Sequence, residues 1–237
     1  KPDYAKAHYN LGNILIDLGK LKAAELSHRK AIELKPDFAK AYYNLGAILK
    51  DLGKTEEAKL IEKKEIDLSF IQNIDAKFRN NCIQNLELSK SQFRQDLFAL
   101  CELNFIKNGF FIEFGACDGL VSSNSYLLEK FFNWRGILAE PGLCWHSKLK
   151  TFRSANIETK CVWKLSDKEI LFNETNKYKQ LSTIDTFADA DHESIYRKGS
   201  RRYKVKTISL LDLLSKYSAP KYIDYLSIDT EGSEYEI

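Results

Sequence analysis

The segment FIEFGACDGL, residues 111–120, combines residue types that could bind a small molecule. Glu113 stands among bulky apolar residues, and two glycines, Gly115 and Gly119, follow it four residues apart. Glycine allows a tight turn and a close approach of the backbone to a ligand, because it has no side chain in the way. The segment therefore predicts a ligand-binding loop that carries one carboxylate.

Further acidic residues follow two other apolar runs. Glu140 ends the run ILAE, 27 residues after Glu113, and Asp229 follows the run YLSI. A dinucleotide fits poorly, because the glycine spacing is G-x-x-x-G and Glu113 would repel a pyrophosphate. S-adenosylmethionine has an ammonium and a sulfonium but no phosphate, and Glu140 could accept hydrogen bonds from both of its ribose hydroxyls. The alternative is a structural strand, turn and helix with a surface glutamate.

The elements that must position these residues alternate between strands and helices. The apolar runs predict strands at residues 110–114, 137–140, 157–165, 204–210 and 225–228, and helices at residues 122–132, 146–152 and 211–217. Ser122, Ser123 or Asn124 could cap the first helix, and Ser209 with Asp212 forms a capping box for the last. Such an alternation predicts a mostly parallel sheet covered on both faces. Ligands bind such sheets at the carboxyl ends of the strands.

The beginning of the chain follows a different pattern. When residues 1–34 are aligned with residues 35–68, 21 of the 34 positions are identical. The period and the residues Leu11, Gly12, Gly19, Ala24, Ala31 and Pro36 resemble the tetratricopeptide repeat. Small residues such as Ala24 and Ala31 would let two antiparallel helices approach closely. The resemblance implies helical hairpins that bind a protein partner.

The rest of the chain resembles a second family. The segments SQFRQDLF, FFIEFGACDGLVSSNSYLLEKFFNWRGILAEP and YIDYLSIDTEGSEYEI are similar to the FkbM family of S-adenosylmethionine-dependent methyltransferases, over residues 91–237. The resemblance implies a Rossmann-like sheet. It also implies transfer of a methyl group to a hydroxyl oxygen of a sugar or another small molecule.

Roles for single residues follow from this resemblance. The cofactor loop would contain Glu113, Gly115, Ala116, Asp118 and Gly119. Glu140 would accept the ribose hydroxyls, and Ser166 and Asp167, expected to follow the third strand, would face the adenine. Asp229, with Glu231 as the second candidate, would take the proton of the acceptor or orient it, and no metal is expected.

These patterns predict three parts of the chain: repeats at residues 1–68, a partly helical linker at residues 69–90, and an incomplete methyltransferase sheet at residues 91–237. The chain has no methionine and opens on Lys1 within the repeat pattern, so we expect it to be part of a longer protein. Further repeats or a signal peptide would be compatible with this pattern. The last strands of the family would follow Ile237, so residues 225–228 should be unusually exposed.

Composition argues against several other classes of protein. The net charge of +3, without a domain-wide basic excess, gives no reason to expect nucleic acid. No apolar run approaches the ~20 residues of a membrane span. The five cysteines form no C-x-x-C pair, and with four histidines they predict neither a disulfide framework nor a zinc site. We therefore expect a cytoplasmic protein.

Two other functions stay open. The chain could be an interaction protein whose methyltransferase-like half is inactive, or a glycosyltransferase fused to repeats. Cys117 is interpreted as a packing residue, and His146 and His192 as surface groups. A basic run is interpreted as a solvated edge strand or as a site for an acidic glycan; its members are Arg197, Lys198, Arg201, Arg202, Lys204 and Lys206.

Overall fold

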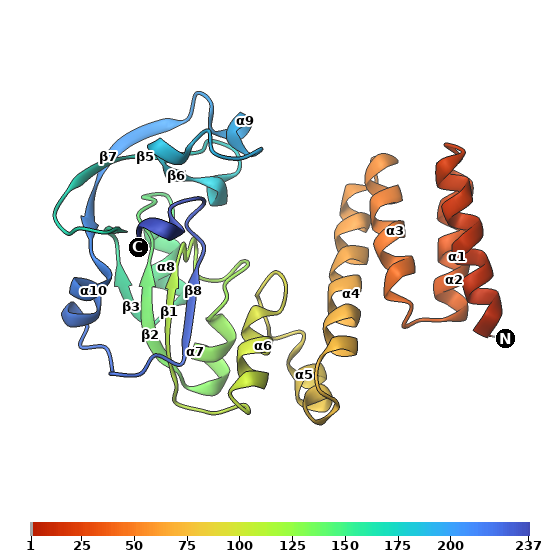
Figure 1. Ribbon diagram of the computed structural model, residues 1–237, viewed down its shortest axis with the longest axis horizontal. Coiled ribbons are helices and arrows are strands. Elements are labelled where there is room, and N and C mark those ends of the chain that lie inside the picture. The colour runs from red at the N-terminus through yellow and green to blue at the C-terminus, as the bar shows by residue number, and fades with distance from the viewer. Residues whose placement is uncertain (1) are drawn as a thin grey trace. The chain divides into compact units, whose positions relative to one another are not determined.

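The computed structural model describes residues 2–237, which divide between Leu86 and Glu87 into two compact units (Figure 1). Lys1, on which the repeat pattern was expected to open, lies outside the described residues. Helices make up the first unit, and two sheets with surrounding helices make up the second.

The first unit begins with two helical hairpins, as the repeat pattern predicts. Their helices are α1 (Pro2–Asp17), α2 (Leu21–Leu34), α3 (Ala39–Asp51) and α4 (Thr55–Asn73). Gly19 and Gly53 turn the chain within the hairpins with φ of 70° and 75°, values that glycine adopts without strain. Ala24 and Ala31 are fully buried, and the described part of residues 1–68 contains no strand. These observations confirm the repeat architecture.

Side chains tie the two hairpins together. Glu25 of α2 accepts hydrogen bonds from Arg29 and from Lys54, which precedes α4. Asn44 of α3 donates to Asn13 of α1 over 2.8 Å. The first unit then ends in a short 3-10 helix, η1 (Ala76–Phe78), and α5 (Arg79–Asn85), while α4 continues to Asn73 without a break at residue 68.

The second unit is built on a parallel sheet with the strand order β3-β2-β1-β8. The strands are β1 (Phe110–Phe114), β2 (Arg135–Ala139), β3 (Asn156–Glu158) and β8 (Tyr225–Ile228), and the helices of this part are α6 (Gln95–Glu102), α7 (Tyr126–Phe132), α8 (His146–Phe152) and α10 (Leu210–Lys216). Phe110, Ile112 and Phe114 alternate along β1 and pack with Leu213 of α10. On the other face, the guanidinium of Arg153, just after α8, lies over the ring of Phe111. Both faces of the sheet are therefore covered, as predicted.

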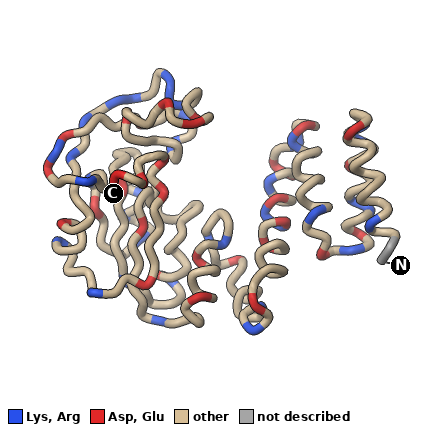
Figure 2. The backbone as a smooth tube through the Cα atoms, viewed as in Figure 1, with Lys and Arg blue, Asp and Glu red and all other residues tan. Residues whose placement is uncertain are grey.

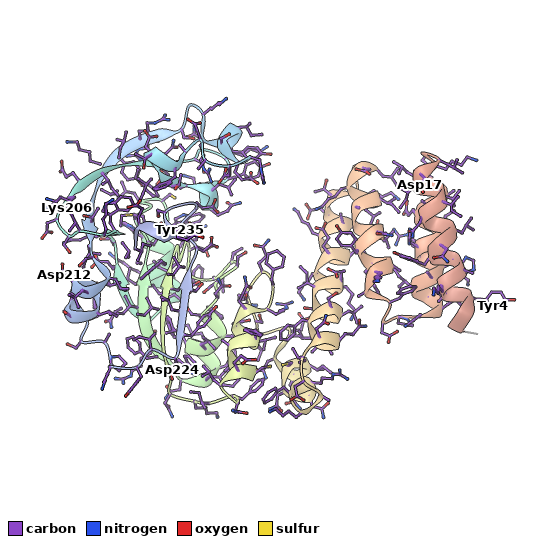
Figure 3. The ribbon with its side chains drawn as sticks, viewed as in Figure 1. Tyr4, Asp17, Lys206, Asp212, Asp224 and Tyr235 are labelled. Atoms are coloured by element: carbon purple, nitrogen blue, oxygen red, sulfur yellow. The ribbon has the colours of Figure 1, made fainter. Side chains whose placement is uncertain are left out.

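A second sheet has the strand order β4-β7-β5-β6. Its elements are β4 (Cys161–Val162), β5 (Glu169–Glu174), β6 (Thr183–Ile184), β7 (Arg201–Ile208), α9 (Ser194–Arg197) and the 3-10 helices η2 (Lys179–Leu181) and η3 (Asp185–Phe187). Figure 3 labels Asp224 just before β8 and Tyr235 beyond its end, in η4 (Glu234–Glu236). The carboxyl ends of the first sheet's strands therefore lie toward the second sheet (Figure 1).

One strand prediction is wrong and another is confirmed. The single strand predicted at residues 157–165 is split into β3 and β4, which belong to different sheets. The chain turns after β3 because the carboxylate of Glu158 accepts hydrogen bonds from the backbone N–H groups of Thr159 and Lys160. The prediction of a solvated edge strand is confirmed for Arg201, Arg202, Lys204 and Lys206: these exposed residues of β7 pair with β5 on one side, while β4 pairs with β7 only at Thr207 and Ile208. Their Lys and Arg positions are blue in Figure 2.

The exposure predicted for β8 is confirmed. This strand is at the edge of the first sheet, and Leu226 and Ile228 are 45% and 37% exposed. Across residues 2–237, none of the helices has both the length and the apolar character needed to cross a membrane. In the same part of the chain, no group of three or more His, Cys, Asp or Glu side chains could hold a metal ion.

Candidate functional site

The loop after β1 depends on its two glycines. Gly115 and Gly119 both have a φ of 76°, in the left-handed region. A Cβ atom on Gly115 would collide with the carbonyl oxygen of Asp229, and one on Gly119 would lie 2.6 Å from carbons of Arg153 and Leu149. The glycines therefore let the loop pass between β8 on one side and α8 on the other.

Glu140 follows β2 and is almost completely buried. One carboxylate oxygen accepts from the N–H of Cys117 over 2.8 Å, and the other accepts from the N–H of Gly142 over 2.6 Å. Burial raises the pKa of Glu140 to about 7, although both hydrogen bonds favour the ionised form. The ring of His146 lies 2.8 Å from the carbonyl oxygen of Glu140, so the interpretation of His146 as a free surface group is wrong.

Asp229 follows β8 on the other side of β1. Its N–H donates to the carbonyl of Phe114, which continues the pairing of β1 with β8. The Asp229 side chain is exposed and makes no hydrogen bond or ion pair among the residues that the structure describes. Partial desolvation, followed by the charge of Glu234, raises the pKa of Asp229.

The pairing register of β1 with β2 and β8 brings Glu140 and Asp229 to the same end of the sheet. Phe114 pairs with Ala139 and with Ile228, so Glu140 and Asp229 flank Gly115 at the same level. Neighbouring strands lie about 4.8 Å apart, so the two carboxylate-bearing positions are roughly 10 Å apart across the glycine. Burial raises the pKa of the Cys117 thiol, and the next contributions come from surrounding carboxylates: Glu140, Glu113, Asp118 and Asp229. The loop is therefore surrounded by carboxyl groups.

Glu113 has a different place from the one expected. We predicted that its carboxylate would face a cofactor beside Glu140. Instead it accepts from the Ser123 hydroxyl over 3.1 Å, from the Asn124 N–H over 2.8 Å and from the Ser125 hydroxyl. Arg153 lies 3.7 Å from it. Glu113 thus ties the segment before α7 to β1. Residues 123–125 donate hydrogen bonds to Glu113, so α7 begins later than predicted. Its N-cap residue is Ser125, and not Ser122, Ser123 or Asn124.

The remaining predicted loop residues shape the turn itself. Ala116 is buried, and its N–H lies 3.4 Å from the carbonyl oxygen of Ala139. The carboxylate of Asp118 accepts from the N–H groups of Leu120 and Val121 over 3.0 and 2.9 Å. An aspartate that caps its own turn in this way stabilises a loop without repeating secondary structure.

Glu231 is engaged in an ion pair. It has a φ of 59°, and one carboxylate oxygen lies 2.8 Å from the guanidinium of Arg197. Burial, followed by the charge of Asp229, raises the pKa of Glu231 to about 7. Arg197 is only 1% exposed and also contacts Asp191 over 2.7 Å and the carbonyl of Leu181 over 2.8 Å. Its assignment to a solvated basic run is therefore wrong.

Ser166 and Asp167 lie elsewhere. They belong to the turn between β4 and β5, because the third strand of the first sheet ends at Glu158 and not at Leu165. The hydroxyl of Ser166 contacts Ser209 and Asp212 at the beginning of α10. Asp167 is exposed and forms an ion pair with Lys160 over 3.0 Å. The expectation that these two residues follow the third strand is wrong.

The sequence analysis gave no site role to several residues around the site. They are Ser123, Ser125, Arg153, Glu174 and Tyr203, which are linked to the loops after β1 and β2 by hydrogen bonds. A run of four polar residues at 122–125, inside a predicted helix start, was the only visible signal. Nothing in the spacing of Arg153, Glu174 or Tyr203 points to the site.

The fold and the site define a class of protein before any comparison. The order β3-β2-β1-β8 is the order 3-2-1-4 when only the strands of this parallel sheet are numbered. A parallel sheet with this order and with polar groups at the carboxyl ends of its strands is a Rossmann-like domain. A family model described as a methyltransferase FkbM domain matches residues 113–237, more than half of the 237-residue chain. The chain therefore belongs to the FkbM methyltransferase family. A model of the TPR repeat matches residues 12–53, and no curated protein matches the chain.

Proposed function

We propose that the chain is an S-adenosylmethionine-dependent methyltransferase that acts on a hydroxyl oxygen of a sugar or another small molecule. The proposal rests mainly on the register that puts Glu140 and Asp229 on either side of Gly115. Membership of the FkbM family supports the general reaction, and the charge of the site supports the cofactor class. The TPR repeats are proposed to bind a protein partner, and a cytoplasmic location is proposed from the scattered cysteines alone.

The charge of the site fits a cationic cofactor without phosphate. Among the described residues, neither Glu140 nor Asp229 forms an ion pair with a lysine or arginine. Each oxygen of Glu140 accepts one backbone hydrogen bond, so each retains a lone pair that a ribose hydroxyl could use. We propose that Gly115, Ala116, Asp118 and Gly119 form the backbone of the binding loop. Glu113 stabilises that loop through the hydrogen bonds that it accepts from residues 123–125.

Methyl transfer requires the chain to orient the acceptor hydroxyl and to supply a base for its proton. When bound, S-adenosylmethionine supplies a methyl group already activated for transfer. Transfer of that group to a hydroxyl oxygen would release a proton, and Asp229 would orient the acceptor hydroxyl and take this proton. Asp229 suits this role because it is unpaired and its raised pKa makes it a stronger base than an ordinary aspartate. Glu231 is the second candidate, but its carboxylate is held by Arg197.

Calorimetric titration of S-adenosylhomocysteine and, separately, NAD into the protein tests the proposal. We expect S-adenosylhomocysteine to bind and NAD not to bind. Glu140→Ala should weaken binding about ten- to a hundredfold, because it removes charge-assisted hydrogen bonds of roughly 1.5–3 kcal/mol each. Glu169→Ala is the control, because Glu169 contacts Lys204 on the second sheet and lies away from the loop.

The alternatives give different results in the same experiment. A domain that serves only protein interaction would bind neither compound. A glycosyltransferase would bind a sugar nucleotide and not S-adenosylhomocysteine. Equal affinity of the parent and Glu140→Ala for S-adenosylhomocysteine would remove Glu140 as the ribose acceptor.

A further inference from the structure

We infer that Tyr203 and Glu174, which belong to the second sheet, are positioning residues for the cofactor site because they hold the loop that follows Glu140. This inference rests on the proposed function, in which Glu140 accepts the ribose hydroxyls. Neither residue is adjacent to the site in sequence, and neither touches the Glu140 carboxylate. Both hold the loop by hydrogen bonds to Leu143 and Cys144, and the charge of Glu174 also contributes to the raised pKa of Glu140.

The contacts form a small closed network. Tyr203 of β7 lies opposite Phe172 of β5, two residues before Glu174. The Tyr203 hydroxyl donates to the Glu174 carboxylate over 2.9 Å and accepts from the N–H of Leu143 over 3.0 Å. The same carboxylate oxygen of Glu174 accepts from the N–H of Cys144 over 3.2 Å. Two successive N–H groups of the loop are thus bound by two side chains of the second sheet.

Burial and ionisation make this network suited to its role. Glu174 is 4% exposed, and burial alone would raise its pKa. Hydrogen bonds from Tyr203 and Cys144 more than offset burial, so the pKa of Glu174 is lowered and the group is an anionic acceptor. Burial and the adjacent carboxylate raise the pKa of Tyr203, which therefore keeps the proton that it donates. Hydrogen bonds to a charged acceptor are stronger than neutral ones.

The held loop is the one that wraps Glu140. The N–H of Gly142 donates to the Glu140 carboxylate, and His146 contacts the Glu140 carbonyl. Leu143 and Cys144 lie between these two contacts, and Leu143 is half exposed, so the loop has little apolar packing of its own there. If these two residues were released, the Gly142 N–H would lose its fixed position. The second sheet, which faces the carboxyl ends of the first (Figure 1), therefore sets the orientation of Glu140.

Tyr203→Phe tests this inference with a change of one hydroxyl and almost no volume. We expect its affinity for S-adenosylhomocysteine, measured by calorimetry, to be roughly three- to tenfold weaker than that of the parent, since two hydrogen bonds are lost. Tyr217→Phe is the matched control. Its hydroxyl also bonds to the backbone of the same unit, at the Ile157 carbonyl over 2.9 Å, but does not touch the loop. This variant should bind as the parent does.

A double-mutant cycle separates positioning from a general loss of structure. In a Glu140→Ala background, Tyr203→Phe should cost no further affinity, because the residue through which it acts is absent. An effect of equal size in both backgrounds would overturn the inference. Amide hydrogen exchange at Leu143 and Cys144, measured without ligand, should be faster in Tyr203→Phe than in the parent and unchanged in Tyr217→Phe.

The outcomes distinguish this inference from the proposed function. If the parent does not bind S-adenosylhomocysteine, the proposed function is overturned and the inference is overturned with it. If the parent binds and Tyr203→Phe binds equally well, only the inference is wrong. Faster exchange at Leu143 and Cys144 together with unchanged affinity would also overturn it, because the loop would then be held without serving the site.

Discussion

Among single residues, Glu140 is the one whose ionisation bears most directly on the proposed cofactor site. Its pKa of about 7 means that the carboxyl is mostly neutral below neutral pH and mostly ionised above it. An ionised carboxylate accepts hydrogen bonds from two ribose hydroxyls, whereas a neutral carboxyl must give up one acceptor position to its own proton. Cofactor affinity should therefore follow the charge of this one residue.

We expect affinity for S-adenosylhomocysteine to rise between about pH 6 and about pH 8, by up to roughly tenfold. Calorimetry in a series of buffers measures this rise. Glu140→Gln, which cannot ionise, should bind weakly and without the rise. A parent protein whose affinity is flat across the range would show that Glu140 does not carry the ribose contact.

Gly115 gives a second prediction at this scale. Gly115→Ala places a methyl group against the Asp229 carbonyl, whereas Gly199→Ala has the same kind of φ, 69°, with no atom within 4 Å of the new Cβ. Gly199→Ala should therefore cost only about 1 kcal/mol of backbone strain. Gly115→Ala should cost clearly more in urea unfolding and should abolish cofactor binding. Equal destabilisation by the two substitutions would contradict the close approach of the loop to β8.

At the scale of elements, Arg197 links α9 to the segment that follows β8. Its guanidinium joins Asp191, the Leu181 carbonyl and Glu231, and Thr183 of β6 donates to the Glu231 carbonyl over 2.8 Å. A Cβ atom added to Gly232 would lie 3.3–3.6 Å from the side chain of Phe187 in η3. The second sheet and its helices thus hold the segment that contains Glu231 as well as the loop after Glu140.

Arg197→Met should destabilise the second unit by about 3 kcal/mol, because it leaves carboxylates partly buried without their partner. Tryptophan fluorescence during urea unfolding measures this unit alone, since Trp134, Trp145 and Trp163 all belong to it. Arg202→Met is the control: Arg202 pairs with Asp185 at an exposed position and should cost less than about 1 kcal/mol. Similar losses for both variants would mean that Arg197 has no special role.

At the scale of the whole molecule, the two units should respond to acid in opposite ways. In the first unit, His28 is fully buried over Gly12, and neither ring nitrogen has a hydrogen-bond partner within the described residues. Burial lowers the pKa of His28, so the folded state resists protonation. In the second unit, burial raises the pKa of Glu140 and Glu231 to about 7, so the folded state binds protons more readily than the unfolded chain.

Below about pH 6.5, where an unfolded histidine takes up a proton, the first unit should lose stability as pH falls. The second unit should instead gain stability as pH falls from about 7 toward 4.5, because its raised carboxyl pKa values favour the protonated folded state. Thermal unfolding followed by far-UV circular dichroism and by tryptophan fluorescence separates the two transitions. His28→Phe should abolish the acid sensitivity of the first; a parent whose two transitions shift together would contradict the assignment.

Much of the fold was predictable because it depends on local patterns. The 34-residue repeat, with Gly19 at a turn and Ala24 at a helix contact, specifies its hairpins through residues close in sequence. The apolar runs predict β1, β2 and β8, and the capping box at Ser209 is confirmed by its bond from the Asp212 N–H. The same runs place Glu140 and Asp229 at strand ends, where a parallel sheet gathers its ligands.

The sequence by itself therefore determined the kinds of element, their order and the two carboxylates proposed for the site. Only the tertiary structure decided which strands pair, and pairing depends on contacts between distant residues that no local period records. That is why residues 157–165 divide between two sheets and why Arg197 is buried within a run that looks solvated. It is also why Glu113 serves the segment before α7, and why Tyr203 and Glu174, 60 and 30 residues from the loop after Glu140, hold that loop.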